Sequence, residues 1–131
     1  MNRIKALVIE DEEVSGAVLT KSLEQLGVTV HQVSNLNQAF ETISANLPSV
    51  IFLDLHLEDA KGGLEFLKLR KKITALQNVP VFIVSVSADF DTISNAMRQG
   101  ADDYLIKPII PELLKRMLAK HFVIAQDLNR A

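Results

Sequence analysis

Short runs of apolar, often β-branched residues alternate along this chain with stretches whose apolar positions recur at helical spacing. Runs of the first kind are typical of buried strands in a parallel sheet. Five such strands are predicted: Ile4–Ile9, Val28–Val33, Val50–Leu55, Val81–Val84 and Tyr104–Ile106. The run Val50–Leu55 is the most apolar of them, which favours a place at the centre of the sheet.

A helix is predicted after each strand. The ranges are Glu12–Leu26, Asn37–Leu47, Leu64–Ile73, Asp91–Arg98 and Pro111 to at least Ile124. Glycine or proline marks several of the ends, as expected of helix termini, at Gly27, Pro48, Gly100 and Pro111. Apolar helical positions should face the sheet, among them Val14, Val18, Leu19, Leu23, Met97 and Met117. Five β–α pairs with short connections predict an α/β domain with helices on both faces of a parallel sheet.

Composition narrows the class of protein. With 131 residues, 48% of them hydrophobic, the chain is long enough for one domain with a single core. We expect residues 1–125 to form that domain and residues 126–131 to be a C-terminal tail or the start of a linker. The absence of cysteine excludes disulfides, thiolate metal sites and cysteine nucleophiles.

Charge and hydropathy exclude further functions. The net charge of -2 comes without a basic run, so direct nucleic-acid binding is not expected. No stretch approaches the roughly 18 apolar residues of a membrane span. The first residues enter a strand without a signal-peptide pattern, which predicts a cytoplasmic protein.

Ionisable residues follow three of the predicted strands directly. Glu10 and Asp11 follow the first strand, Asp54 lies at the end of the third, and Lys107 follows the fifth. The carboxyl ends of parallel strands meet at one edge of the sheet, where open α/β sheets bind ligands. Three carboxylates and one ammonium group should therefore converge there, which indicates a site for a cation and a phosphate.

Each of these residues has a candidate role and a simpler explanation. Glu10 and Asp11 could bind Mg²⁺, or they could be the acidic start of a helix. Asp54 is a candidate nucleophile for phosphoryl transfer, because a carboxylate at the end of a buried strand is costly unless it is paired. Lys107 could contact a phosphoryl oxygen, and the Lys107–Pro108 bond is a candidate cis peptide.

Two serines follow the fourth strand. Ser85 could donate its hydroxyl to a bound phosphoryl group, or it could cap the strand end. Ser87 competes with Ser85 for that role.

The ordered set of motifs closely resembles the receiver domain of two-component response regulators. The matching residues are Glu10-Asp11, Leu53-Asp54, Gly62 or Gly63 with Leu64-Glu65-Phe66-Leu67, Ser85, and Gly100 to Pro108. The resemblance covers residues 3 to 124. It implies a flavodoxin-like (βα)5 three-layer sandwich with a parallel sheet of strand order 2-1-3-4-5.

The resemblance also implies a mechanism. Asp54 would accept a phosphoryl group from a histidine of a sensor kinase or histidine phosphotransfer protein. Mg²⁺ or Mn²⁺ would be held by Asp11, by Glu10 through water, by Asp54 and by the backbone carbonyl of His56. Lys107 and Ser85 would contact the phosphoryl group. The protein would then not be a conventional turnover enzyme.

The resemblance further implies a switch. Ser85 would move toward the phosphoryl group and Tyr104 would swing inward. This would reshape the face made by the fourth helix, last strand and last helix, which would control an output domain, a downstream partner or a homodimer. The sequence does not identify the cognate kinase or the output.

Two segments depart from the family pattern. Val86 stands where alanine or glycine is usual, so Val86, together with Ser87, should modulate access to Asp54. Glu58 replaces a usual proline, and the loop through Lys61-Gly62-Gly63 is one residue longer than usual.

Two other functions remain open. The chain could be a docking module that does not depend on phosphorylation. It could also be a haloacid-dehalogenase-like phosphatase, which is less favoured because His56 occupies the position of that family's second acid and there is no room for a cap insertion.

Overall fold

The computed structural model describes residues 4–57 and 62–122. Its strands are β1 (Lys5–Ile9), β2 (Thr29–Val33), β3 (Val50–Asp54), β4 (Val81–Ser85) and β5 (Asp103–Ile106). Its helices are α1 (Glu13–Gln25), α2 (Leu36–Ala45), α3 (Gly63–Arg70), α4 (Phe90–Arg98) and α5 (Pro111–His121), with a short 3₁₀ helix at Thr74–Leu76. Each predicted strand and helix is therefore present.

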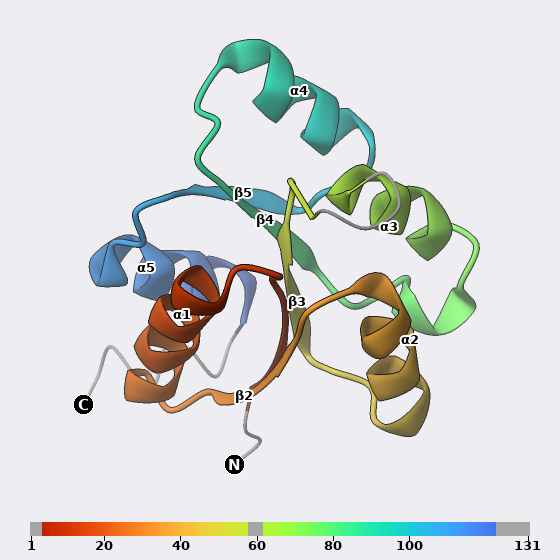
Figure 1. The fold of residues 1–131 in the computed structure, drawn as a ribbon, viewed down its shortest axis with the longest axis horizontal. Helices are drawn as coiled ribbons and strands as arrows, with labels where there is room; N and C mark the ends of the chain where they lie inside the picture. The colour runs from red at the N-terminus through yellow and green to blue at the C-terminus, as the bar shows by residue number, and fades with distance from the viewer. Residues whose placement is uncertain (1–3, 58–61, 123–131) are drawn as a thin grey trace.

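The strands form one parallel sheet in the order β2-β1-β3-β4-β5. Helices α1 and α5 cover one face, and α2, α3 and α4 lie on the other (Figure 1). Every residue of β3 is buried, as expected for the central strand. The predicted three-layer, flavodoxin-like architecture and its strand order are confirmed.

Helices α2, α3 and α5 end earlier than predicted, and α2 ends at Ala45 and not at Leu47 because its carboxyl cap, Asn46, has an extended backbone. Helix α3 stops at Arg70, whose carbonyl accepts the side-chain amide of Gln77 at 2.9 Å. Helix α5 stops at His121, since Phe122 has an extended backbone. The expectation that this helix reaches Ile124 was therefore wrong at Phe122, and Ile124 itself lies outside the described residues.

The buried stripes of two helices are narrower than predicted. Val14 and Val18 are 69% and 48% exposed, because α1 faces the sheet with Gly16, Leu19 and Leu23. Met97 is 40% exposed, since Ala96 is the buried residue of α4, whereas Met117 is buried as predicted. Apolar side chains are thus left on the outer surfaces of α1 and α4.

Arg70 ties α3 to the start of β4 and to the loop before β5. Its guanidinium donates to the carbonyls of Val79 (2.7 Å) and Gly100 (2.8 Å) and to the carboxylate of Asp102 (3.1 Å). The same Asp102 carboxylate accepts the amide of Val81 at 2.8 Å. Arg70 therefore holds the edge of the sheet opposite the carboxylates.

Within residues 4–57 and 62–122, no helix is long and apolar enough to cross a membrane.

Candidate phosphoryl and metal site

Three carboxylates converge at the carboxyl ends of β1 and β3. Oxygens of Glu10, Asp11 and Asp54 all lie within 4.8 Å of one another. Glu10 and Asp54 are only 4% and 7% exposed, and Asp11 is the more accessible of the three. Oxygen donors grouped in this way suit a hard divalent cation.

Lys107 brings a positive charge into this cluster from the end of β5. Its ammonium group donates to Glu10 Oε1 at 2.7 Å, and its side chain is 17% exposed. The backbone amide of Lys107 donates to the carbonyl of Ser85 at 2.8 Å, and the Lys107–Pro108 bond is cis. The lysine expected to contact a phosphoryl group is therefore paired with a carboxylate of the same site.

The electrostatics of the cluster shift the pKa values of its two buried carboxyl groups in opposite directions. Burial, together with the hydrogen bond and negative charge of Glu10, raises the pKa of Asp54 to about 7. Glu10 is also buried, yet its hydrogen bonds with Asp54 and Lys107 outweigh that effect and lower its pKa. Glu10 is therefore the more readily ionised of the two, and Asp54 keeps its proton to a higher pH. A cation beside Asp54 would favour its ionised form.

Two glycines let α3 begin against the end of β3. Gly62 has φ +73°, a conformation that other residues rarely adopt. A Cβ on Gly63 would lie 2.7 Å from the carbonyl oxygen of Asp54. Both glycines are thus required for this close approach, although the resemblance alone singled out one or the other.

The loop after β4 is joined to its neighbours by hydrogen bonds. Ser85 is 1% exposed, and its Oγ accepts the amide of Ser87 at 3.0 Å. The Tyr104 hydroxyl donates to the carbonyl of Ser87 at 2.8 Å, and the Tyr104 ring packs against the core. His56 Nε2 forms a hydrogen bond with Ser87 Oγ at 3.1 Å. Sequence reasoning did not foresee this last contact, and no local pattern in the sequence signals it.

Of the residues that depart from the family pattern, the structure describes Val86 but not Glu58. Val86 lies between the two serines with a side chain that is 69% exposed, so it is not packed into the core. Its effect on access to Asp54 stays a prediction. Glu58 and Lys61 lie outside the described residues.

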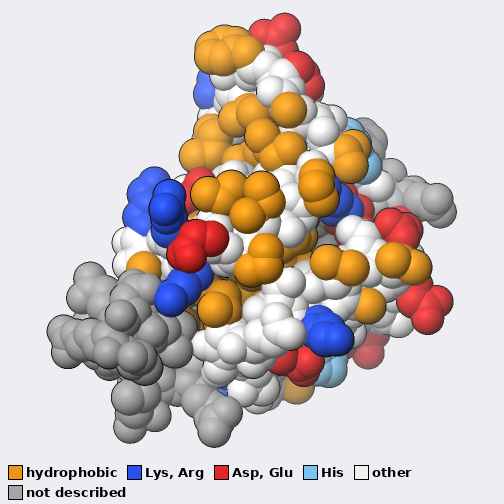
Figure 2. Space-filling view, turned by 90° about the vertical axis from the view of Figure 1, so that its left-hand side faces the viewer, with side chains coloured by type: hydrophobic (Ala, Val, Ile, Leu, Met, Phe, Trp, Pro, Cys, Tyr) orange, Lys and Arg blue, Asp and Glu red, His pale blue; other side chains and the backbone are white. Residues whose placement is uncertain are grey.

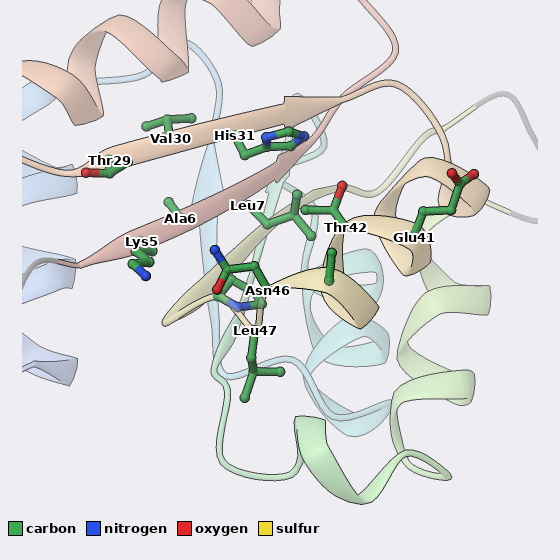
Figure 3. Close-up of a pocket in the computed structure, with 12 residues that line it drawn as sticks. Lys5, Ala6, Leu7, Thr29, Val30, His31, Glu41, Thr42, Asn46 and Leu47 are labelled. Carbon is green, nitrogen blue, oxygen red and sulfur yellow. The ribbon is translucent and has the colours of Figure 1, made fainter.

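A cavity of about 560 Å³ lies between α2 and the amino-terminal halves of β1 and β2 (Figure 3). Leu7, His31 and Thr42 project toward it, with Leu47 on the α2 side. It contains none of the carboxylates described above, and it opens near the amino ends of the strands. The cavity is therefore separate from the acidic site.

The fold and the site together define an open α/β protein with an acidic, lysine-containing centre at the carboxyl edge of its sheet. The sequence model of the response regulator receiver domain matches residues 6–119. The chain belongs to this family, as its motifs predicted.

Individual relatives match over most of this chain. It is 32% identical over 108 residues to the luminescence regulatory protein LuxO of Vibrio campbellii, which covers 82% of this chain and 23% of LuxO. It is 34% identical to the KDP operon transcriptional regulatory protein KdpE of Escherichia coli, covering 85% of this chain and 48% of KdpE. The chain thus spans a quarter to a half of the length of these relatives.

Solved structures share the fold. The receiver domain of a Luxo repressor protein from Vibrio parahaemolyticus has a TM-score of 0.82 and 26% identity and covers 99% of both chains. Chemotaxis protein CheY4 of Vibrio cholerae has a TM-score of 0.84 at 20% identity, covering 92% of this chain and 100% of CheY4. The receiver domain of sensor histidine kinase PA1611 from Pseudomonas aeruginosa, at 24% identity and a TM-score of 0.81, covers 91% of this chain and 97% of its own, and holds a magnesium ion in its active-site cleft.

Proposed function

We propose that this receiver domain is a cytoplasmic, Mg²⁺-dependent phosphoacceptor and that Asp54 receives the phosphoryl group. The donor would be a phosphohistidine of a sensor kinase or histidine phosphotransfer protein. The observation that carries this proposal is the buried Asp54 carboxylate, grouped with Glu10 and Asp11 and influenced by the charge of Lys107.

The transfer is a displacement at phosphorus. A carboxylate oxygen of Asp54 forms the new P–O bond, the P–N bond to the donor breaks, and its electron pair returns to the imidazole nitrogen. Lys107 would leave Glu10 to contact an oxygen of the transferred group, and the Ser85 hydroxyl would donate to another. Hydrolysis of the acyl phosphate then restores the Asp54 carboxylate.

The donor set fits Mg²⁺ and also Mn²⁺, because all the candidate ligands are hard oxygens. Asp11 and Asp54 would bind the ion with the backbone carbonyl of His56, and Glu10 would act through water. The ion would supply positive charge that offsets the repulsion between Asp54 and an incoming phosphate. Burial, and after it the hydrogen bond and charge of Glu10, raise the pKa of Asp54, and a cation bound beside the carboxylate would offset both effects.

The output would be carried by the face formed by α4, β5 and α5. A groove of about 450 Å³ runs along β5 and α5, with Ile106, Ile110 and Leu113 in its lining, each between 42% and 49% exposed. Figure 2 shows hydrophobic side chains gathered over this side of the molecule, with lysine and arginine beside them. We propose that Asp54 phosphorylation, through Ser85 and Tyr104, changes how this face binds an output domain, a downstream protein or a second copy.

Labelling with a small phosphoryl donor tests the proposal. The protein is incubated with phosphoramidate and Mg²⁺, and its intact mass is followed. The wild type should gain one acid-labile phosphoryl group, and Asp54→Asn should gain none while keeping its fold. Asp91→Asn, which alters an exposed carboxylate of α4, should label like the wild type. Labelling of Asp54→Asn to the wild-type level would refute the assignment.

A docking module that works without phosphoryl transfer is the second candidate, because the groove along β5 and α5 is already open in this structure. Beryllofluoride with Mg²⁺ distinguishes the two. Amide spectra that change near Asp54, Ser85 and Tyr104 support the phosphoacceptor, and unchanged spectra support the docking module. Turnover of free phosphate esters would instead indicate a phosphatase.

A further inference from the structure

Ser87 is held by hydrogen bonds from three separate segments. Its amide donates to Ser85 Oγ in β4 at 3.0 Å, and its carbonyl accepts the Tyr104 hydroxyl of β5 at 2.8 Å. Its own hydroxyl bonds to His56 Nε2, in the loop after β3, at 3.1 Å. The position of this one residue therefore depends on β4, on β5 and on the loop that follows Asp54.

His56 is in turn tied to Asp54. The backbone amide of His56 donates to Asp54 Oδ1 at 3.0 Å, while its side chain reaches across to Ser87. Contacts thus run without a gap from the Asp54 carboxylate through His56 and Ser87 to the Tyr104 hydroxyl. A second path connects the same loop to Ser85, whose Oγ accepts the Ser87 amide.

We propose that His56 is a positioning residue, and that its imidazole holds the loop after β4 where the Ser87 carbonyl can accept the Tyr104 hydroxyl. A change at the Asp54 carboxylate alters the position of His56, and the bond to Ser87 passes this change to Tyr104. The regulatory role of this link rests on the proposed function. Its effect on Tyr104 in the unmodified protein is independent of phosphorylation.

The chain supplies its own probe for this link. It contains one tyrosine and no tryptophan, so near-ultraviolet absorption and fluorescence of tyrosine report on Tyr104 alone. Donating a hydrogen bond to a carbonyl shifts the tyrosine absorption band to longer wavelength and quenches its fluorescence. Loss of the Tyr104–Ser87 bond should therefore shift the band to shorter wavelength and raise the emission.

Three substitutions isolate the side-chain contact. His56→Phe keeps a planar ring and the backbone amide and carbonyl but removes the bonding nitrogen. His56→Gln places an amide nitrogen near the position of Nε2. Ser87→Ala removes Oγ and keeps the carbonyl that Tyr104 needs. His56 is exposed and Ser87 is half-buried, so all three variants should fold, which circular dichroism checks. His31→Phe, at an exposed histidine of β2, is the matched control.

In the unmodified protein, His56→Phe and Ser87→Ala should each give the shifted, brighter Tyr104 spectrum, and the double variant should equal either single one. His56→Gln and His31→Phe should resemble the wild type. A Tyr104 spectrum unchanged in both His56→Phe and Ser87→Ala would overturn the proposal. So would additive effects in the double variant, or failure of His56→Gln to restore the spectrum.

Beryllofluoride with Mg²⁺ tests the regulatory part. The wild-type Tyr104 spectrum should change when the analogue binds, and His56→Phe should bind it, by fluorine NMR, with a reduced change at Tyr104. An equal change in both proteins would refute the coupling. If the wild type binds no analogue, the proposed function fails, whereas the comparison in the unmodified protein still decides the role of His56.

Discussion

The Lys107 ammonium group and the Glu10 carboxylate form a close, largely buried ion pair, 2.7 Å apart, with side chains 17% and 5% exposed. Removing one member of such a pair leaves the other charge buried without compensation. Breaking the pair should therefore cost stability, and the pair also holds the lysine beside the site where a phosphoryl group would arrive.

Lys107→Met should lower the free energy of unfolding by about 3 kcal/mol, because Glu10 is left buried and unpaired. Urea denaturation measures this loss. Adding Glu10→Gln to Lys107→Met should recover much of it. Lys120→Met is the control, since Lys120 is 72% exposed and 3.8 Å from Asp103, and its loss should cost less than about 0.5 kcal/mol. Equal losses in the two lysine variants would contradict this account.

Asp54 should make stability fall as pH rises from about 4 to 7. Its native pKa of about 7 lies above the ordinary value of 3.8, so the native state binds more protons than the unfolded state in this window. Asp54→Asn removes the free-energy cost of ionising this buried carboxyl group. It should be more stable than the wild type by about 2 to 4 kcal/mol at pH 8 without Mg²⁺, the upper figure being the full pKa shift and the lower one allowing for partial solvation of the site, and about equal near pH 4. Thermal unfolding across pH measures the difference, and a gap that does not grow with pH would show the pKa to be ordinary.

Mg²⁺ should reverse this order of stability at pH 8. The ion would bind the native carboxylates and not the unfolded chain, so wild-type stability should rise with the logarithm of its concentration above the dissociation constant. Asp54→Asn lacks one ligand charge and should respond less. Melting temperatures at several Mg²⁺ concentrations test this, with Asp91→Asn as a variant that should behave like the wild type. An equal response of Asp54→Asn would place the ion elsewhere.

Val86→Ala should speed both the gain of a phosphoryl group from phosphoramidate and its later loss. Val86 stands between Ser85 and Ser87 with a branched side chain 69% exposed, where it can narrow the approach to Asp54. Time courses of intact mass give both rates. Val18→Ala, at an exposed valine of α1, should leave them unchanged. If Val86→Ala also leaves both unchanged, Val86 does not control access.

Gly63→Ala should destabilise the protein by about 1 to 3 kcal/mol, because its Cβ would meet the backbone oxygen of Asp54 at 2.7 Å. It should also weaken Mg²⁺ binding, since the end of β3 must shift. Gly16→Ala is the comparison: the atoms nearest to its Cβ belong to the side chain of Gln32, which can turn away, and alanine favours the helix. Denaturation and Mg²⁺ titration of both variants measure the contrast. A smaller loss of unfolding free energy for Gly63→Ala than for Gly16→Ala would contradict this prediction.

The sequence predicted the parts of this protein that depend on the spacing of apolar residues and on the direction of the strands. Buried strands alternating with helices require a parallel sheet, and a parallel sheet brings Glu10, Asp54 and Lys107 to one edge. The convergence of the carboxylates follows from that topology alone.

Side-chain partners were less accessible to sequence reasoning. The bond between His56 and Ser87 depends on the shapes of two loops, and the pairing of Lys107 with Glu10 depends on which of several nearby carboxylates the ammonium group meets. Helix faces were misjudged for a related reason. Val14 lies close to the apolar stripe of α1, but the orientation of that helix is set by packing against the sheet and not by the stripe's centre.

The site is assembled from the ends of β1, β3, β4 and β5, and Glu10 and Lys107 are separated by 97 positions in the chain. A chain still emerging from the ribosome, or one truncated before β5, lacks the lysine and the neighbouring strand that complete the centre. Phosphoryl acceptance as proposed above would therefore be restricted to molecules in which the whole sheet has formed. Partly made or unfolded copies would not compete for the donor, so only fully folded molecules would become phosphorylated.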